Sequence, residues 1–234
     1  MKKLLALVLT MLFVIASSAH AAPCLIPEAL TDVDINFSSF EWYSDYPTVI
    51  ELADEMNWGK YSDWFSRGGC TTPHWTIFKE AANCFAGSES NCGGSLLFYK
   101  VPKVAGYEDV TAHLYFIFRP GLGNYENYNA PGAMCLYLGE YEFSPADLDA
   151  CYDDLVQKLA NIYGDTAYVG EDKSISYNYT YWVNNDDAVV GICKKSTEVV
   201  ISYSAPHSEE NLEQIEQWIA KTEIENAAGD SSGL

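Results

Sequence analysis

The 234-residue sequence predicts an α+β fold in which helices pack on one face of an antiparallel sheet. Three observations predict it. Residues 144–164 carry apolar side chains at steps of three and four, which is typical of an amphipathic helix. Other segments alternate apolar and polar residues, which is typical of strands with one buried face. The order of these segments, a helix followed by three strands, occurs twice.

The first half begins with a predicted helix at residues 47–56, with Pro47 near its start. Residues 72–87 fit either a further helix or a strand. Three predicted strands follow at residues 95–101, 109–118 and 133–143. The middle strand shows the pattern best, because its apolar residues share one face. These residues are Val110, Ala112, Leu114, Phe116 and Phe118.

The second half begins with the helix at residues 144–164. Ser144 is the predicted N-cap, Pro145 suits the first turn, and Gly164 ends the helix. Its acidic residues fall off the apolar stripe and predict a solvated face. The predicted stripe consists of Leu148, Tyr152, Leu155, Leu159 and Ile162.

Three more strands are predicted at residues 174–183, 188–194 and 197–204, with a hairpin turn at 184–187 between the first two. A closing helix is predicted at residues 207–221. In the first of these strands Tyr177, Tyr179 and Tyr181 share one face. Because Ile175 and Val183 flank them, that face is predicted to point toward the helices, which directs Trp182 outward.

These elements divide the chain into two similar units and two terminal segments. Residues 1–21 have the positive start, apolar run and small-residue cleavage pattern of a bacterial signal peptide. The first unit spans residues 22–143 and includes a cysteine-containing connection, and the second spans 144–224 with the closing helix. Residues 225–234 predict a frayed tail. The expected location is therefore secreted, periplasmic or on the exterior of the cell envelope, without stable membrane insertion.

The formal net charge is −20, and an acidic chain of this kind repels nucleic acid. In an oxidising compartment cysteines predict disulfides. The odd number, seven, leaves at least one thiol outside intramolecular pairs. The spacing leaves their pairing open. The disulfide candidates are Cys70, Cys84, Cys92, Cys135, Cys151 and Cys193.

Sequence motifs for phosphate and metal binding are missing. The chain lacks a glycine-rich phosphate loop, an H-E-x-x-H motif and a C-x-x-C pair. We expect no cofactor and no metal site. The sequence leaves enzyme activity open and favours a protein without it.

The most suggestive surface is the loop at residues 121–132. Tyr125 and Tyr128 lie there among asparagines and glycines, as in adaptable recognition loops. We expect Tyr125, Asn127, Tyr128 and Trp182 to bind a protein or glycan. The favoured function is a secreted, non-catalytic binding protein with a protein partner. The alternative is a secreted hydrolase or a glycan-binding protein that acts on extracellular polysaccharide.

The doubled order of a helix and three strands resembles that of uncharacterised secreted proteins of anaerobic bacteria. The segments "FEWYSDYPTVIEL" at the start of the first unit and "LYLGEYEF" before the long helix carry the resemblance. More distantly, the order resembles the tandem architecture of β-lactamase inhibitor proteins and the small outer-membrane-assembly lipoprotein domain. The resemblance spans roughly residues 37–205 and implies a protein-binding module without catalysis of its own.

Overall fold

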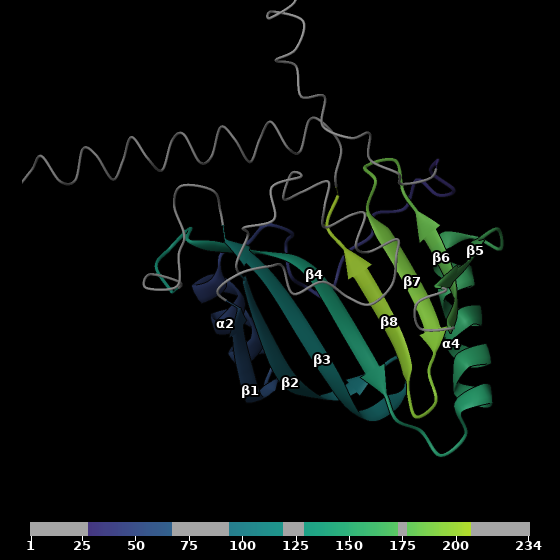
Figure 1. Cartoon of the computed structure of the whole chain (residues 1–234), viewed down its shortest axis with the longest axis horizontal. Coiled ribbons are helices and arrows are strands. Elements are labelled where there is room, and N and C mark those ends of the chain that lie inside the picture. The colour runs from purple at the N-terminus through teal and green to yellow at the C-terminus, as the bar shows by residue number, and fades with distance from the viewer. Residues whose placement is uncertain (1–27, 67–93, 119–128, 173–176, 207–234) are drawn as a thin grey trace, which may run out of the picture.

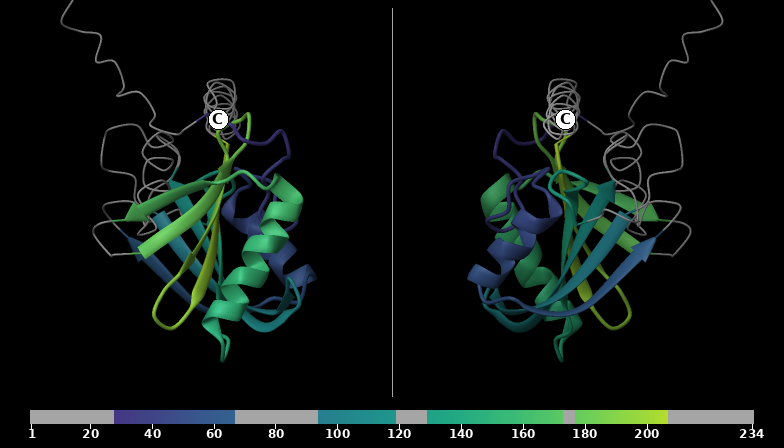
Figure 2. Two further views of the ribbon diagram at one scale, coloured as in Figure 1. Left: turned by 90° about the vertical axis from the view of Figure 1, so that its right-hand side faces the viewer. Right: turned by 90° about the vertical axis from the view of Figure 1, so that its left-hand side faces the viewer.

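The computed structural model of the chain describes residues 28–66, 94–118, 129–172 and 177–206. Within these residues, eight strands form one antiparallel sheet and two helices lie on one of its faces (Figures 1 and 2). The elements of the first half are α2 (Tyr46–Glu55), β1 (Gly59–Ser66), β2 (Gly94–Val104), β3 (Tyr107–Phe118) and β4 (Met134–Phe143). Those of the second half are α4 (Leu148–Tyr163), β5 (Tyr168–Asp172), β6 (Tyr177–Val183), β7 (Val189–Lys194) and β8 (Val199–Ser204).

The strand order is β1-β2-β3-β4-β8-β7-β6-β5, so two four-stranded meanders join where β4 pairs with β8. The predicted α+β class is confirmed. The prediction of three strands in each half is wrong, because the described residues of each half already form four. The two missed strands, β1 and β5, form the edges of the sheet, where a strand needs no continuous apolar alternation. In β5 a glycine and two acidic residues hide the pattern.

The predicted helix at 47–56 corresponds to α2, which begins one residue earlier. Its N-cap is Asp45, whose Oδ1 accepts a hydrogen bond from the backbone N–H of Thr48 at 3.0 Å. The N-cap of α4 is Asp147 and not Ser144, because the Asp147 carboxylate accepts from the N–H of Ala150. The segment 72–87, which fits a helix or a strand, and the predicted helix at 207–221 lie outside the described residues.

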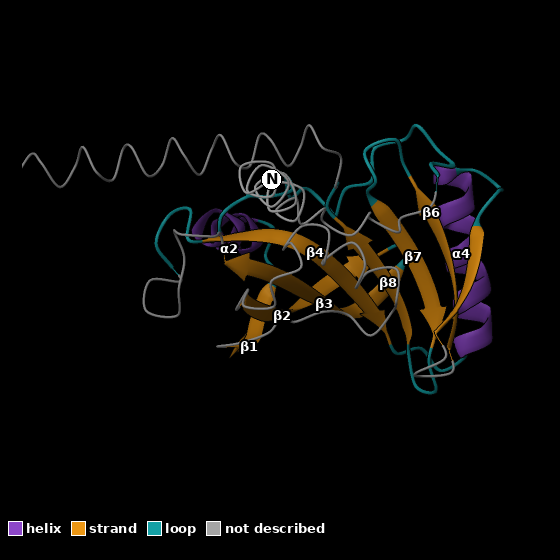
Figure 3. Cartoon of the chain, turned by 45° about the horizontal axis from the view of Figure 1, so that its top comes forward, coloured by secondary structure: helices purple, strands orange, loops and turns teal. Residues whose placement is uncertain are grey.

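The helix-side core is the set of buried apolar residues between the sheet and the two helices. Figure 3 shows the helices at separate ends of the sheet, with α2 beside the first meander and α4 beside the second. The predicted inward face of β3 is confirmed for the four residues whose side chains are described. Helix-side core residues include Phe37, Phe40, Val49, Trp58, Val110, Ala112, Leu114, Phe116, Tyr141, Cys151, Leu155, Leu159, Tyr163, Trp182 and Ile201. Ile162 was expected in this core, but it is 55% exposed and Tyr163 is buried in its place.

Phe37 lies at the centre of the helix-side core, directly on the backbone of β4. A Cβ atom added to Gly139 would stand 2.3 Å from carbon atoms of the Phe37 ring. The ring also lies 4.5 Å from Tyr141 and 5.6 Å from Tyr203, measured between centroids. Because Tyr141 belongs to β4 and Tyr203 to β8, one side chain contacts both sides of the central strand pair.

The other face of the sheet is also buried, and we call its apolar residues the opposite-face cluster. They are Tyr115, Ile117, Cys135, Tyr137, Leu138, Tyr179, Tyr181, Val183, Val189, Cys193, Val200 and Ala205. Tyr179 and Tyr181 thus face away from the helices, contrary to the prediction. The prediction failed because it assumed one wet face, whereas both faces bury side chains and apolar alternation does not distinguish them.

The same reversal of the two faces of β6 changes the position of Trp182. It was expected to point outward, but it is 1% exposed and belongs to the helix-side core. Its indole N–H donates to the carbonyl of Gly164 at 2.8 Å, just beyond the end of α4. On the same face, the hydroxyls of Thr180 and Tyr152 are hydrogen-bonded at 3.2 Å. A polar residue therefore faces the helix, while the tyrosines lie behind the sheet.

We predict that Gly139→Ala lowers the free energy of unfolding by about 1–3 kcal/mol, because the new methyl group forces the Phe37 ring off the strand. Chemical denaturation with guanidinium measures the change. Gly59→Ala is the matched control in strand β1, since its Cβ would meet only Lys100 at an ordinary 3.9 Å.

The double variant tests the cause. Phe37→Ala alone costs about 3–5 kcal/mol, and it should cost less in the Gly139→Ala background, where the ring is already displaced. Strict additivity of the two changes, or equal effects of the two glycine substitutions, would contradict the proposed contact.

Candidate functional site

A row of residues crosses the sheet on the face opposite α2 and α4. Each member is the register partner of the next, so the row runs straight from β2 to β5. We call it the transverse row. It consists of Phe98, His113, Glu140, Ser202, Gly191, Tyr181 and Tyr168. Tyr61 of β1 extends the row, because its ring packs on Phe98 at 5.9 Å between centroids.

Glu140 lies at the centre of the transverse row and is 7% exposed. Its carboxylate accepts hydrogen bonds of 2.6 Å from the Tyr115 hydroxyl and 2.6 Å from the Ser202 hydroxyl. Burial by itself would raise the pKa of Glu140, but hydrogen bonds from His113, Ser202 and Tyr115 and the charge of His113 hold it below its ordinary value. The centre of the row is therefore a buried carboxylate held in its ionised form.

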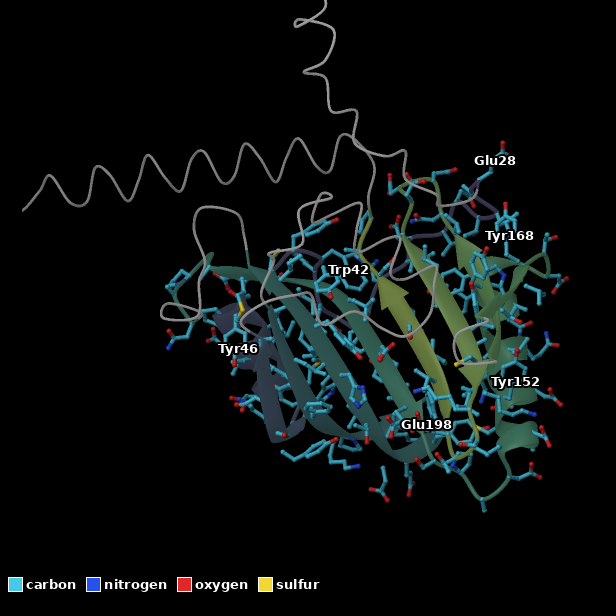
Figure 4. The ribbon with its side chains drawn as sticks, in the orientation of Figure 1. Glu28, Trp42, Tyr46, Tyr152, Tyr168 and Glu198 are labelled. Carbon is cyan, nitrogen blue, oxygen red and sulfur yellow. The ribbon has the colours of Figure 1, made fainter. Side chains whose placement is uncertain are left out.

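Glu142 lies two residues along the same strand and the same face, yet its environment acts in the opposite direction. Burial and the neighbouring charge of Glu198 raise the pKa of Glu142, against the effect of His113. Glu198 in turn pairs with Lys195 at 2.5 Å, in the turn between β7 and β8. Figure 4 labels Glu198 at this end of β8.

The first-meander end of the row is aromatic and partly open. Tyr61 is 53% exposed, and the Lys100 ammonium lies 5.4 Å from the centre of its ring, within the range of a cation–π contact. Lys100 also donates to the hydroxyl of Thr111 at 2.8 Å. Tyr61 is thus a large aromatic side chain of the edge strand that contacts Phe98 and Lys100 and is available to solvent.

The second-meander end of the row is a stack of tyrosines. Tyr168 and Tyr181 stack with centroids 5.2 Å apart and planes 27° apart, and Tyr179 follows at 5.4 Å from Tyr181. The Tyr168 hydroxyl donates to the carbonyl of Glu28 at 3.0 Å, and Figure 4 labels these two residues close together. Burial raises the pKa of Tyr181 to about 12, with smaller effects of the other two phenols.

Two of the disulfide candidates are buried thiols on different faces of the sheet. Cys151 of α4 belongs to the helix-side core, and Cys193 of β7 belongs to the opposite-face cluster, so they cannot pair with each other. Burial raises the pKa of both thiols. Cys135 is buried in the opposite-face cluster. Cys70, Cys84 and Cys92 lie outside the described residues, and their pairing stays a prediction.

Of the predicted binding residues, Tyr125, Asn127 and Tyr128 lie outside the described residues. The end of their loop is described, and it is tied to α2, because the N–H of Gly132 donates to Asp45 Oδ2 at 3.2 Å. Trp182 lies under α4 and is not available to a partner. Within the described ranges, no group of three or more His, Cys, Asp or Glu side chains could hold a metal ion.

The sequence patterns do not single out Tyr61, Phe98, His113 or Glu140 as site residues. The sequence indicates only which face of its strand each polar residue occupies. In "HLY" at 113–115 and "EYE" at 140–142, the polar residues alternate with apolar ones and therefore lie on the face away from the apolar residues of their strands. Their meeting depends on the β3–β4 register, which sequence spacing does not specify.

Comparisons with protein-family models, curated proteins and solved structures found no match to the chain. Among the residues that the structure describes, neither helix has the length and apolar character needed to cross a membrane.

We predict that Glu140→Gln lowers the free energy of unfolding at pH 7 by about 1–3 kcal/mol, because a charged acceptor of two hydrogen bonds becomes a neutral amide. The folded pKa of Glu140 is depressed, so its contribution is present above the ordinary glutamate value of 4.5 and is lost as the pH falls through the folded pKa. Denaturation of both proteins between pH 7 and pH 3 should therefore show the difference shrinking in acid.

Glu142→Gln should raise the free energy of unfolding at pH 7, the opposite of the effect of Glu140→Gln. Its folded pKa is raised, so the carboxyl contributes stability that is full below the ordinary value and is lost as the pH rises through the folded pKa. The variant is then more stable than wild type at pH 7, and this advantage disappears in acid. Glu108→Gln, at an exposed position of β3, is the control. The same sign for both variants at pH 7 would contradict the assignment.

Proposed function

We propose that the chain is an exported, non-catalytic binding protein of the bacterial cell envelope or exterior, and that it recognises a protein partner. The observation that carries the proposal is the transverse row, which places an exposed aromatic residue at one end and a fully engaged carboxylate at its centre. The proposed contact surface is the face opposite the helices around Tyr61, together with the loop at residues 121–132.

The state of Glu140 favours binding over turnover. A catalytic carboxylate must reach a proton or a reacting atom of the substrate. Glu140 is 7% exposed, and Tyr115 and Ser202 already occupy its oxygens. A carboxylate held in this way contributes to the shape and the charge of a surface, but substrate has little access to it.

The open part of the row is its Tyr61 end, because Glu140, Ser202 and Tyr181 are only 7%, 0% and 8% exposed. The proposed protein partner therefore contacts this end of the face. Tyrosine is among the residue types that dominate the energy of protein interfaces.

The export part of the proposal rests on sequence. Residues 1–21 fit a signal peptide, the charge is strongly acidic, and seven cysteines suit an oxidising compartment. Neither nucleic acid nor a membrane is a proposed partner.

We also infer that the two halves are copies of one unit, a helix followed by a four-stranded meander. Glu140 and Ser202 are a register pair of β4 and β8, and on its two sides Gly139 faces Tyr203 and Tyr141 faces Ile201. A two-fold rotation at this pair exchanges Tyr141 with Tyr203. The element order resembles the tandem architecture of β-lactamase inhibitor proteins, which are binding proteins.

One observation favours the alternative of a glycan hydrolase. Glu140 and Glu142 lie on one face of one strand, and their pKa values are shifted in opposite directions. Such a pair fits the acid and base roles of a glycosidase. In that case Glu142 would be the acid, and Glu142→Gln would abolish turnover of a soluble polysaccharide.

We predict that Tyr61→Ala weakens partner capture by a factor of about 30 or more, the equivalent of losing an interface hot spot of about 2 kcal/mol. Immobilised exported protein is incubated with the secreted and envelope proteins of its own culture, and the amount of each captured protein is compared between variants. Val169→Ala is the matched control, because Val169 is 77% exposed but lies on the helix side of edge strand β5.

Loss of one captured protein with Tyr61→Ala, but not with Val169→Ala, supports the face. The double variant Tyr125→Ala with Tyr128→Ala tests the loop in the same assay. Equal capture by all variants would refute this surface. Release of sugars from xylan or from peptidoglycan sacculi by wild type, and not by Glu142→Gln, would replace binding with hydrolysis.

A further inference from the structure

His113 lies between two carboxylates of the neighbouring strand. Its Nδ1 is 3.6 Å from Glu140 Oε2, and its Nε2 is 3.7 Å from Glu142 Oε2. The side chain is 15% exposed, and the Phe98 ring stands edge-on to it with centroids 4.9 Å apart and an interplanar angle of 71°. Both ring nitrogens therefore face an acceptor across the β3–β4 ladder.

The charge of the imidazole decides how many of these acceptors it serves. An imidazolium carries an N–H donor on both nitrogens, whereas a neutral imidazole carries one donor and one lone pair. A neutral ring would thus turn a lone pair toward one carboxylate. With both carboxyls ionised, the arrangement of His113, Glu140 and Glu142 is complementary to the charged ring.

We propose that His113 is a pH-sensitive clasp between β3 and β4, in which the imidazolium holds both Glu140 and Glu142 and the neutral ring releases one of them. Histidine is the side chain whose charge ordinarily changes between about pH 5 and 8. The clasp therefore closes toward acid and opens toward alkaline pH.

The released residue is Glu142. When the ring is neutral, Glu140 keeps its hydrogen bonds from Tyr115 and Ser202 and remains the better acceptor for the remaining donor. The neutral ring then carries its proton on Nδ1, toward Glu140. Glu142 is left beside Glu198, free to turn toward solvent at the open part of this face.

Two lysines also lie on this face. The charge of Lys195 acts with His113 to lower the pKa of Glu142, but Lys195 is ion-paired with Glu198, and Lys100 donates to Thr111. The titratable side chains around His113, among the described residues, are Tyr61 of β1, Lys100 of β2, Tyr115 of β3, Glu140 and Glu142 of β4, Cys193 of β7, Lys195 of the turn and Glu198 of β8.

NMR of the ¹⁵N-histidine-labelled wild-type chain tests the clasp directly, with His113→Gln used only to assign the signals. We expect protons on both His113 nitrogens at pH 5 and a single proton on Nδ1 at pH 8. In Glu142→Gln the neutral ring appears at lower pH than in wild type. A neutral ring that carries its proton on Nε2, or a titration unchanged by Glu142→Gln, would overturn the proposal.

Stability gives a second readout that needs no partner. Removing His113 should reduce the folding equilibrium constant more at pH 5.5 than at pH 8, because only the charged ring holds both carboxylates. Glu108→Gln should leave this ratio unchanged and Glu142→Gln should reduce it. Equal effects of His113→Gln at the two pH values would contradict the clasp. If that variant does not fold, the wild-type NMR titration decides.

Discussion

The pairing of β4 with β8 is the contact on which the eight-stranded sheet depends. It is the pairing that joins the meander β1–β4 to the meander β5–β8 within the described residues. On the helix side, Phe37 spans the pair, and it reaches the strand backbone only because residue 139 is glycine. On the other side, Glu140 and Ser202 are hydrogen-bonded across the same pair. Side-chain contacts on both faces of the sheet therefore stabilise the pairing of β4 with β8.

Burial on both faces explains which parts of the fold could be predicted. The long helix and strands β2, β3, β4, β6, β7 and β8 have periodic apolar residues, and the sequence was sufficient to locate them. The faces of β6 could not be assigned, because Tyr181 and Trp182 are both buried, on opposite sides. The edge strands β1 and β5 lack the pattern, since an edge needs charge and irregularity to avoid pairing with other chains.

The candidate site was less predictable than the fold, for a different physical reason. Glu140 and His113 are far apart in sequence and meet through register, which local propensity does not encode. The loop at residues 121–132 was predicted to bind a partner from its composition alone. By contrast, the residues of the transverse row are individually ordinary, and only the register of the strands aligns them into one row.

The buried carboxylate of Glu140 at the centre of the transverse row specifies the strand register more than it stabilises the fold. Replacing a buried ionic group by an apolar one is often neutral or stabilising, so Glu140 is not required for stability as such. It does specify register. A slip of β8 by one residue would set the buried carboxylate against Ile201 or Tyr203 instead of Ser202 and would invert the faces of the strand. Because β7, β6 and β5 follow β8 in the sheet, that single pair also aligns the tyrosines at the far end with Tyr61 at the near end.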